Sequence, residues 1–175
     1  MKPALSVVFF TVSSGAGLGL LVWLLIASLM ADHIRMDATA FYKGAAIAAA
    51  LITAGLISST LHLANRKNAI YSLARIRTSW LSREGLLALV LYPLAALHLA
   101  ALHFGWPQIT PITMWTLVVT AIAILYCTGM IYGCLRTIPR WNTWMTPTKY
   151  VLFGLMSGSV NHASAEQDGD GIGDQ

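Results

Sequence analysis

The feature that most constrains this chain is a run of 28 residues, Ala4 to Ala31, without a charged side chain. An α-helix needs about 20 apolar residues to cross the hydrocarbon core of a bilayer, whereas the apolar region of a secretory signal is only about 7–15 residues long. The run is therefore too long for a cleaved signal, and it predicts a retained membrane span.

Three further apolar blocks follow, separated by polar or basic segments. The predicted spans are about Ala4–Met30, Gly44–Leu63, Gly85–Phe104 and Thr113–Leu135. A fifth apolar block starts near Tyr150 but becomes small, polar and acidic after Met156, and so short a block cannot cross a bilayer. The predicted fold is all-α, a polytopic transmembrane helix bundle of four full spans plus an incomplete fifth. Residues 1–156 are predicted to form this bundle, and residues 157–175 an acidic, disordered tail.

Composition supports a membrane protein and argues against nucleic-acid binding. Only 10% of the residues are charged, against about 25% in soluble domains, so the protein has too few charges to cover a water-facing surface. The net charge of +4 comes from basic residues clustered between apolar blocks. Since no basic stripe with interleaved aromatic residues is present, no nucleic-acid partner is predicted.

The distribution of lysine and arginine predicts the orientation of the spans. Nine of the eleven basic residues fall in the N-terminus, the connection between the second and third spans, and the segment after the fourth. The opposite side holds only Arg35 and Lys43. Because cytoplasmic loops carry an excess of lysine and arginine, the N-terminus and the basic connection are predicted to be cytoplasmic.

A histidine and a carboxylate stand at the ends of two consecutive spans. His62 lies in the last turn of the second predicted span, and Glu84 lies at the start of the third. Antiparallel helices bring these ends to the same membrane face, where both groups are suitable acceptors for the protons that a quinol releases on oxidation. We predict His62 and Glu84 as the functional pair. The alternative is that both side chains merely reach toward the interface.

The spacing of the other histidines disfavours haem. A b-type haem usually needs two axial histidines at one depth on different helices. His98 lies thirteen residues into the third span, about 20 Å from its start, whereas His62 lies at the end of the second. We expect His98 to be hydrogen-bonded inside the bundle instead. The cysteines form no CxxC motif, so no metal site is predicted.

The basic connection has two interpretations. It can fix topology and attract anionic lipid, or it can dock a peripheral partner. The candidate docking residues are Arg66, Arg75, Arg77 and Arg83.

Three stretches form a combined pattern: KPALSVVFFTVSSGAGLGL from Lys2, STLHLANRKNAIYSLARIRTSWLSRE from Ser59, and LRTIPRWNTWMTP from Leu135. Together they resemble the membrane anchor subunits of the dimethyl sulfoxide reductase family of molybdenum oxidoreductases. With the spans between them, the resemblance covers about Pro3 to Met156. Ala64 and Arg66 stand where the family usually has Gly and Pro.

The resemblance implies a non-catalytic subunit in a bacterial inner (cytoplasmic) membrane, active in anaerobic respiratory electron transport. Such anchors bind menaquinone or ubiquinone and exchange electrons with an iron–sulfur subunit, which serves a molybdopterin catalytic subunit. The molybdopterin and the iron–sulfur clusters belong to those partners, and the anchors carry no haem. The family's quinol-site histidine and glutamate match His62 and Glu84, and the basic connection then resembles part of the docking face.

Several alternatives remain open at this level. The resemblance also fits the anchor of a cytoplasm-facing sulfite dehydrogenase of the same family. Family members are nearly twice as long, so the resemblance implies a C-terminal truncation and allows a non-functional truncated product. A small transporter-like bundle is a further alternative, although no charged residue lies in the middle of a predicted span.

Overall fold

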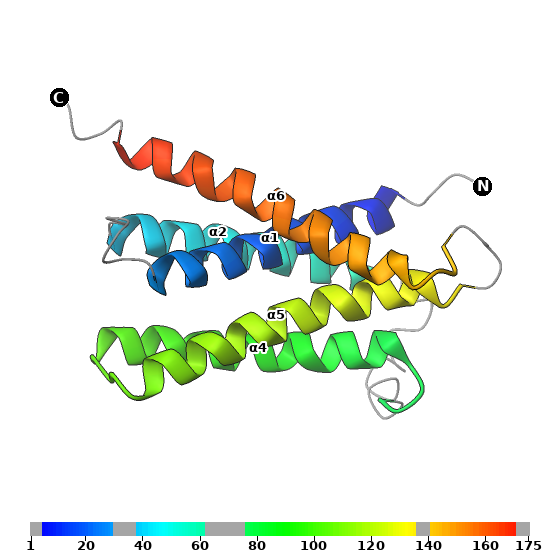
Figure 1. Ribbon diagram of the computed structural model, residues 1–175, viewed down its shortest axis with the longest axis horizontal. Helices are drawn as coiled ribbons and strands as arrows, with labels where there is room; N and C mark the ends of the chain where they lie inside the picture. The colour runs from blue at the N-terminus through cyan, green and yellow to red at the C-terminus, as the bar shows by residue number, and fades with distance from the viewer. Residues whose placement is uncertain (1–4, 30–37, 62–75, 136–140, 171–175) are drawn as a thin grey trace. The chain divides into compact units, whose positions relative to one another are not determined.

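The computed structural model describes residues 5–29, 38–61, 76–135 and 141–170. These ranges hold five helices and no strand, as Figure 1 shows: α1 (Leu5–Leu29), α2 (Ala38–Leu61), α4 (Trp80–His103), α5 (Ile109–Gly133) and α6 (Met145–Asp170). Within them, α1, α2, α4 and α5 are long and apolar enough to cross a membrane. The predicted all-α class and the four predicted spans are therefore confirmed.

Helix α2 begins earlier than the sequence predicted, at Ala38 rather than Gly44. The predicted start follows directly after Lys43, but Lys43 lies inside the helix with its side chain exposed. A lysine can bury its aliphatic stem along an apolar surface while its ammonium group reaches water, so one charge near a span end does not stop a helix.

Helix α4 also begins earlier, at Trp80 rather than Gly85. Ser79 caps it in an extended conformation, and its side-chain oxygen accepts a hydrogen bond from the backbone N–H of Ser82 at 3.4 Å. A serine in this position satisfies one of the free N–H groups of the first turn. Glu84 consequently lies within the helix, and its side chain is fixed by helix geometry.

One compact unit contains α1, α2 and the part of α6 from Leu152 onward. Small residues let α1 and α2 approach closely: a Cβ on Gly17 would lie 2.9 Å from the carbonyl oxygen of Ala48. The hydroxyl of Ser13 donates to the carbonyl oxygen of Leu51 at 2.8 Å, which adds a hydrogen bond between the two helices. Small residues of the first span therefore pack against the second, as is common in membrane proteins.

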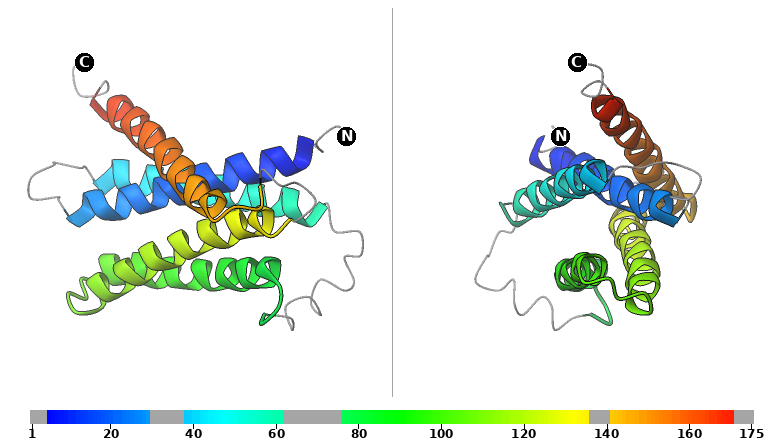
Figure 2. Two further views of the ribbon diagram at one scale, coloured as in Figure 1. Left: turned by 45° about the vertical axis from the view of Figure 1, so that its right-hand side comes forward. Right: turned by 90° about the vertical axis from the view of Figure 1, so that its left-hand side faces the viewer.

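Helix α6 crosses α1 through glycines, and Figure 2 lets the reader follow the crossing from two further sides. Gly19 of α1 lies against Gly154 and Gly158, so that a Cβ on Gly19 would collide with the carbonyl oxygen of Gly154. The indole N–H of Trp23 donates to the carbonyl oxygen of Leu155 at 2.9 Å. Two glycines four residues apart form the small-xxx-small pattern that lets helix backbones meet.

The last helix continues past the point where the sequence predicted a break. The apolar block ends at Met156, but α6 extends to Asp170. Gly158 is buried against Gly19, so the small residues after Met156 form a packing surface and do not end the helix. The division into a bundle and an acidic tail stays a prediction.

The second compact unit contains α4, α5 and the first turns of α6, up to Val151. Helices α4 and α5 lie side by side in Figures 1 and 2. Pro147, near the start of α6, lies over Gly129 of α5, where a Cβ would come within 2.6 Å of the proline Cα. Tyr150 stacks on Tyr132 with their ring centroids 6.3 Å apart.

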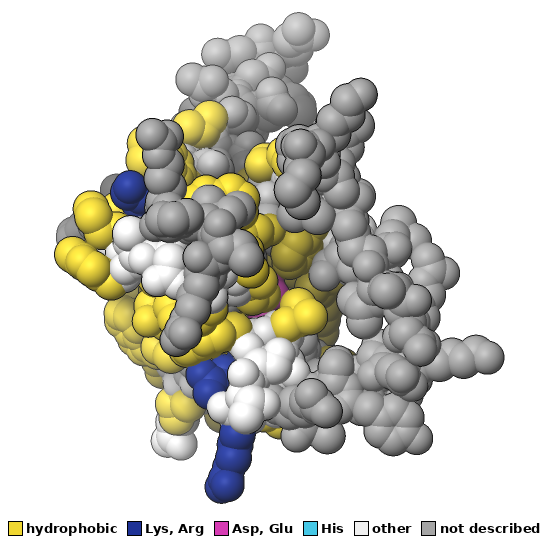
Figure 3. Space-filling model, turned by 90° about the vertical axis from the view of Figure 1, so that its right-hand side faces the viewer, with side chains coloured by type: hydrophobic (Ala, Val, Ile, Leu, Met, Phe, Trp, Pro, Cys, Tyr) yellow, Lys and Arg dark blue, Asp and Glu magenta, His cyan; other side chains and the backbone are white. Residues whose placement is uncertain are grey.

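Hydrophobic side chains prevail among the described side chains drawn in Figure 3. Across the described residues, large exposed hydrophobic side chains also occur on α4 and α5, such as Leu89, Val119 and Trp115. A surface of this kind suits contact with lipid hydrocarbon, since an apolar patch this extensive is rare on a soluble monomer.

A candidate site around a buried carboxyl group

Glu84 is the fifth residue of α4, and only 3% of its surface is exposed. It lies on the buried face of the helix, together with Ala88 and Leu91. A buried carboxyl group is costly unless it is hydrogen-bonded, paired or protonated. Its position therefore requires a partner on a neighbouring element.

That partner is Thr128 of α5. The Thr128 hydroxyl oxygen lies 2.5 Å from Oε1 of Glu84, and it also lies 2.9 Å from the carbonyl oxygen of Ile124 one turn earlier on α5. Thr128 is itself only 1% exposed. A buried hydrogen bond between side chains thus joins the start of α4 to the last third of α5.

Arg83 precedes the glutamate but does not form an ion pair with it. Its Nε donates to the carbonyl oxygen of Ile76 at 2.8 Å, and its Nη2 donates to that of Arg77 at 2.9 Å. The guanidinium also lies over the ring of Trp80, 4.2 Å from the ring centroid, in a cation–π contact. Within the described residues, Glu84 is left with Thr128 as its partner.

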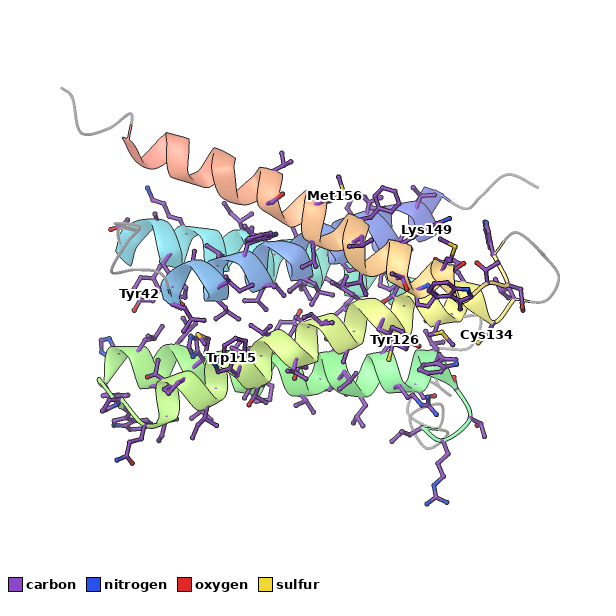
Figure 4. All side chains as sticks on the ribbon, viewed as in Figure 1. Tyr42, Trp115, Tyr126, Cys134, Lys149 and Met156 are labelled. Atoms are coloured by element: carbon purple, nitrogen blue, oxygen red, sulfur yellow. The ribbon has the colours of Figure 1, made fainter. Side chains whose placement is uncertain are left out.

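An aromatic pair lies at the same end of the two helices. Trp80 of α4 and Tyr126 of α5 meet edge to face, with centroids 6.0 Å apart. Trp80 precedes Glu84 by about one helical turn, and Tyr126 precedes Thr128 by about half a turn. Tyr126, labelled in Figure 4, is 42% exposed. The same end of α4 and α5 therefore holds a buried carboxyl group and an accessible aromatic side chain, and a flat aromatic surface can stack on another ring.

The structure describes only some of the predicted site residues. His62, Arg66 and Arg75 lie outside the described residues, so the pairing of His62 with Glu84 stays a prediction. Arg77 is exposed, as a docking residue needs to be. Arg83 is half-buried and its guanidinium is occupied by the turn before α4, which gives it a structural role there.

A second buried polar pair lies toward the other end of the same helices. Nδ1 of His98 lies 2.9 Å from the hydroxyl oxygen of Thr113, which itself lies 3.0 Å from the carbonyl oxygens of Ile109 and Thr110. The prediction that His98 is hydrogen-bonded inside the bundle is confirmed, and its partner lies on the neighbouring helix α5. Within the described residues, its Nε2 is a buried side-chain nitrogen without a partner.

The described residues contain no group of three His, Cys, Asp or Glu side chains that could hold a metal ion. Cys127 is buried and Cys134 is exposed, both as free thiols. Figure 4 shows Cys134 at the C-terminal end of α5.

Comparison with known families decides what kind of protein this is. Residues 1–167 match the DMSO reductase anchor subunit (DmsC) family, which is nearly the whole length of the sequence. The protein belongs to the DMSO reductase anchor subunit family. Family membership and the four apolar helices together identify a multi-pass membrane protein.

Two relatives of this anchor protein illustrate the family. It is 32% identical to the C subunit of the sulfite dehydrogenase of Allochromatium vinosum over 173 residues, which cover 90% of this sequence and 53% of the relative. It is 27% identical to the C subunit of the anaerobic dimethyl sulfoxide reductase of Haemophilus influenzae over 157 residues, covering 88% of this sequence and 55% of the relative. The protein thus spans about half the length of these relatives. No solved structure matches.

The sequence did not reveal Thr128 as part of the site in this member of the DmsC family. A threonine in an apolar helix ordinarily bonds to the carbonyl oxygen four residues earlier, as Thr120 does to Thr116 at 2.7 Å. The signal that could have identified Thr128 is pairing: a buried acid at the start of one span needs a polar partner near the end of the antiparallel neighbour.

Proposed function

We propose that this protein is the membrane anchor of a molybdenum oxidoreductase complex, and that it binds quinone beside Glu84. In this role it passes electrons between the quinone pool and an iron–sulfur partner subunit, and it has no catalytic centre of its own. The observation that carries the proposal is the buried carboxyl group of Glu84, hydrogen-bonded to Thr128 and without an ion-pair partner in the described residues.

The chemistry of quinol oxidation fits such a group. Quinol loses two protons when its two electrons leave, so the site needs proton acceptors at the ring oxygens. Glu84 is one acceptor in this proposal, and His62 is the other. The accessible ring of Tyr126, in contact with Trp80, supports binding of a flat menaquinone or ubiquinone ring. No haem takes part in this proposal, because the electrons pass directly to the partner subunit.

The partners in this proposal are an iron–sulfur subunit and a molybdopterin catalytic subunit, each holding its own cofactor. The basic connection before α4, with exposed Arg77, forms part of their docking face. The complex lies in a bacterial inner membrane with the N-terminus of the anchor in the cytoplasm, in accordance with the excess of basic residues on that side.

A second candidate is the anchor of a sulfite dehydrogenase, in which electrons flow into the quinone pool. It is favoured by the 32% identity to the sulfite dehydrogenase relative, compared with 27% to the dimethyl sulfoxide reductase relative. The same quinone site serves both directions, because the catalytic subunit determines the substrate. Steady-state turnover of the intact complex with sulfite and with dimethyl sulfoxide separates the two.

Titration with a fluorescent quinol analogue tests the quinone-binding proposal. Membranes containing the unmodified protein are compared with membranes containing His62→Ala or Glu84→Gln, and His103→Ala serves as the control because His103 is exposed at the opposite end of α4. We expect saturable binding whose Kd rises at least about tenfold in the first two variants, equivalent to ~1.4 kcal/mol. Binding unaffected by both variants would refute the proposal.

A further inference from the structure

The Thr128 hydroxyl group has two acceptors and one hydrogen. Its oxygen is within hydrogen-bonding distance of both Oε1 of Glu84 (2.5 Å) and the carbonyl oxygen of Ile124 (2.9 Å). A hydroxyl group carries one O–H donor and two acceptor lone pairs. It cannot donate to both oxygens at once, so the proton on Glu84 determines which way the hydrogen points.

Two arrangements satisfy the pair. When Glu84 is ionised, Thr128 donates to its carboxylate, and the carbonyl of Ile124 keeps the backbone bond of the helix. When Glu84 is protonated, its O–H donates to the oxygen of Thr128, and the Thr128 hydroxyl donates to Ile124. Both arrangements use the same heavy-atom positions and keep the Thr128 hydroxyl hydrogen-bonded to Oε1 of Glu84.

We propose that Thr128 is the positioning residue for Glu84, and that its hydroxyl group serves both protonation states of the carboxyl. The proposal rests on the quinone-binding function above. As quinol is oxidised, one quinol O–H bond breaks and an O–H bond forms on Glu84, while the second proton goes to His62 and the two electrons go to the iron–sulfur subunit. Glu84 takes and releases its proton without leaving its buried position.

The groups around Glu84 leave the Thr128 hydroxyl as its hydrogen-bond partner among the described residues. The charged neighbour on α4, Arg83, is held by the carbonyl oxygens of Ile76 and Arg77. On α5, Cys127 directly precedes Thr128 and Tyr132 follows it by about one turn, and both side chains are ordinarily uncharged near neutral pH. Within the described residues no cation is paired with Glu84, so the group that hydrogen-bonds to its carboxyl is the hydroxyl of Thr128.

Infrared spectroscopy of the protein in membranes tests the proposal directly. The carbonyl stretch of a protonated carboxylic acid is measured through a pH titration, and Glu84→Gln assigns the band to Glu84. Thr128→Val and Thr128→Ala both remove the hydroxyl, so that one of them remains informative if the other does not fold. Thr128→Ser retains it. Thr120→Val is the matched control, since Thr120 is a buried α5 threonine whose hydroxyl donates to the carbonyl oxygen of Thr116.

We expect the Glu84 band to move to higher wavenumber in the variants without the hydroxyl, because the acid loses its acceptor. Thr128→Ser and Thr120→Val should both match the unmodified protein. A band that is unchanged in Thr128→Val and Thr128→Ala, or equally displaced in Thr128→Ser, overturns the proposal.

The infrared result is independent of quinone, so it separates this inference from the proposed function. A displaced band supports the role of Thr128 whether or not the quinol analogue binds. A normal band in Thr128→Val together with intact, Glu84-dependent analogue binding leaves the quinone site standing and refutes the role of Thr128.

Discussion

At the scale of single residues, two buried polar pairs connect α4 and α5, and they differ in how completely they are satisfied. Glu84 and Thr128 satisfy each other in either protonation state. His98 is bonded through Nδ1 to Thr113, but its Nε2 has no partner in the described part of the structure. An unsatisfied buried nitrogen costs about 1–3 kcal/mol, which is at least comparable with the roughly 0.5–1.5 kcal/mol that a hydrogen bond contributes.

This imbalance predicts unequal effects of removing the two members of the second pair. His98→Leu removes a hydrogen bond and an unsatisfied nitrogen together, so we expect the free energy of unfolding to change by less than about 1 kcal/mol. Thr113→Val leaves the imidazole buried with no side-chain partner, so we expect a loss of about 1–3 kcal/mol. Thermal unfolding in detergent, followed by circular dichroism, measures both. A larger loss of stability in His98→Leu than in Thr113→Val would contradict the conclusion that Nε2 of His98 is unsatisfied.

At the scale of helices, close backbone approach at glycines determines how α6 packs on α1. Hydropathy was the basis for predicting where the last helix ends, and hydropathy carries no information on small-residue packing. The pattern Gly154-xxx-Gly158 was present in the sequence, but it lies across the point where the apolar block ends. Its role in packing depends on Gly19 of α1, which lies opposite it in the structure, and the sequence alone does not show this pairing.

The glycine crossing predicts a position-specific effect of one methyl group. Gly19→Ala places a Cβ against the carbonyl oxygen of Gly154, whereas Gly15→Ala meets nothing within 4 Å. Both changes give the same gain in helix propensity, so the difference between them measures packing. We expect Gly19→Ala to lower the free energy of unfolding by about 1–3 kcal/mol relative to Gly15→Ala. Equal stabilities in a thermal unfolding experiment would show that α6 does not pack there.

The candidate site was only partly predictable at these two scales. Glu84 was found from sequence because a carboxylate at the edge of an apolar block is unusual. The burial of Glu84 was not predicted, because the cap formed by Ser79 starts α4 at Trp80, ahead of the predicted start at Gly85. Thr128 was missed because hydropathy and spacing treat it like any other helix threonine.

At the scale of the whole molecule, the distribution of charge predicts a single orientation. The C-terminal end of α5 should face the cytoplasm, together with the N-terminus and the basic connection. Cys134 lies at this end and is exposed, while Cys127 is buried within the helix. Chemical labelling of Cys134 can therefore report which side of the membrane this end of α5 faces.

Labelling with a membrane-impermeant maleimide tests that orientation. We expect Cys134 to react in inverted inner-membrane vesicles and not in intact spheroplasts. Cys134→Ser, which retains the buried Cys127, should abolish the labelling and so provides the control. Labelling from the outside of spheroplasts would reverse the assigned orientation and place the site of Glu84 at the other membrane face.

Binding of quinone beside Glu84 is tested most directly by photoaffinity labelling with an azidoquinone. The labelled protein is digested and the modified peptide is identified by mass spectrometry, with and without an excess of unmodified quinone. We expect a modification at the start of α4 or on the facing turns of α5 near Thr128, suppressed by competition and lost in Glu84→Gln. Modification spread over the exposed apolar residues of all helices, unaffected by competitor, would contradict the proposed site.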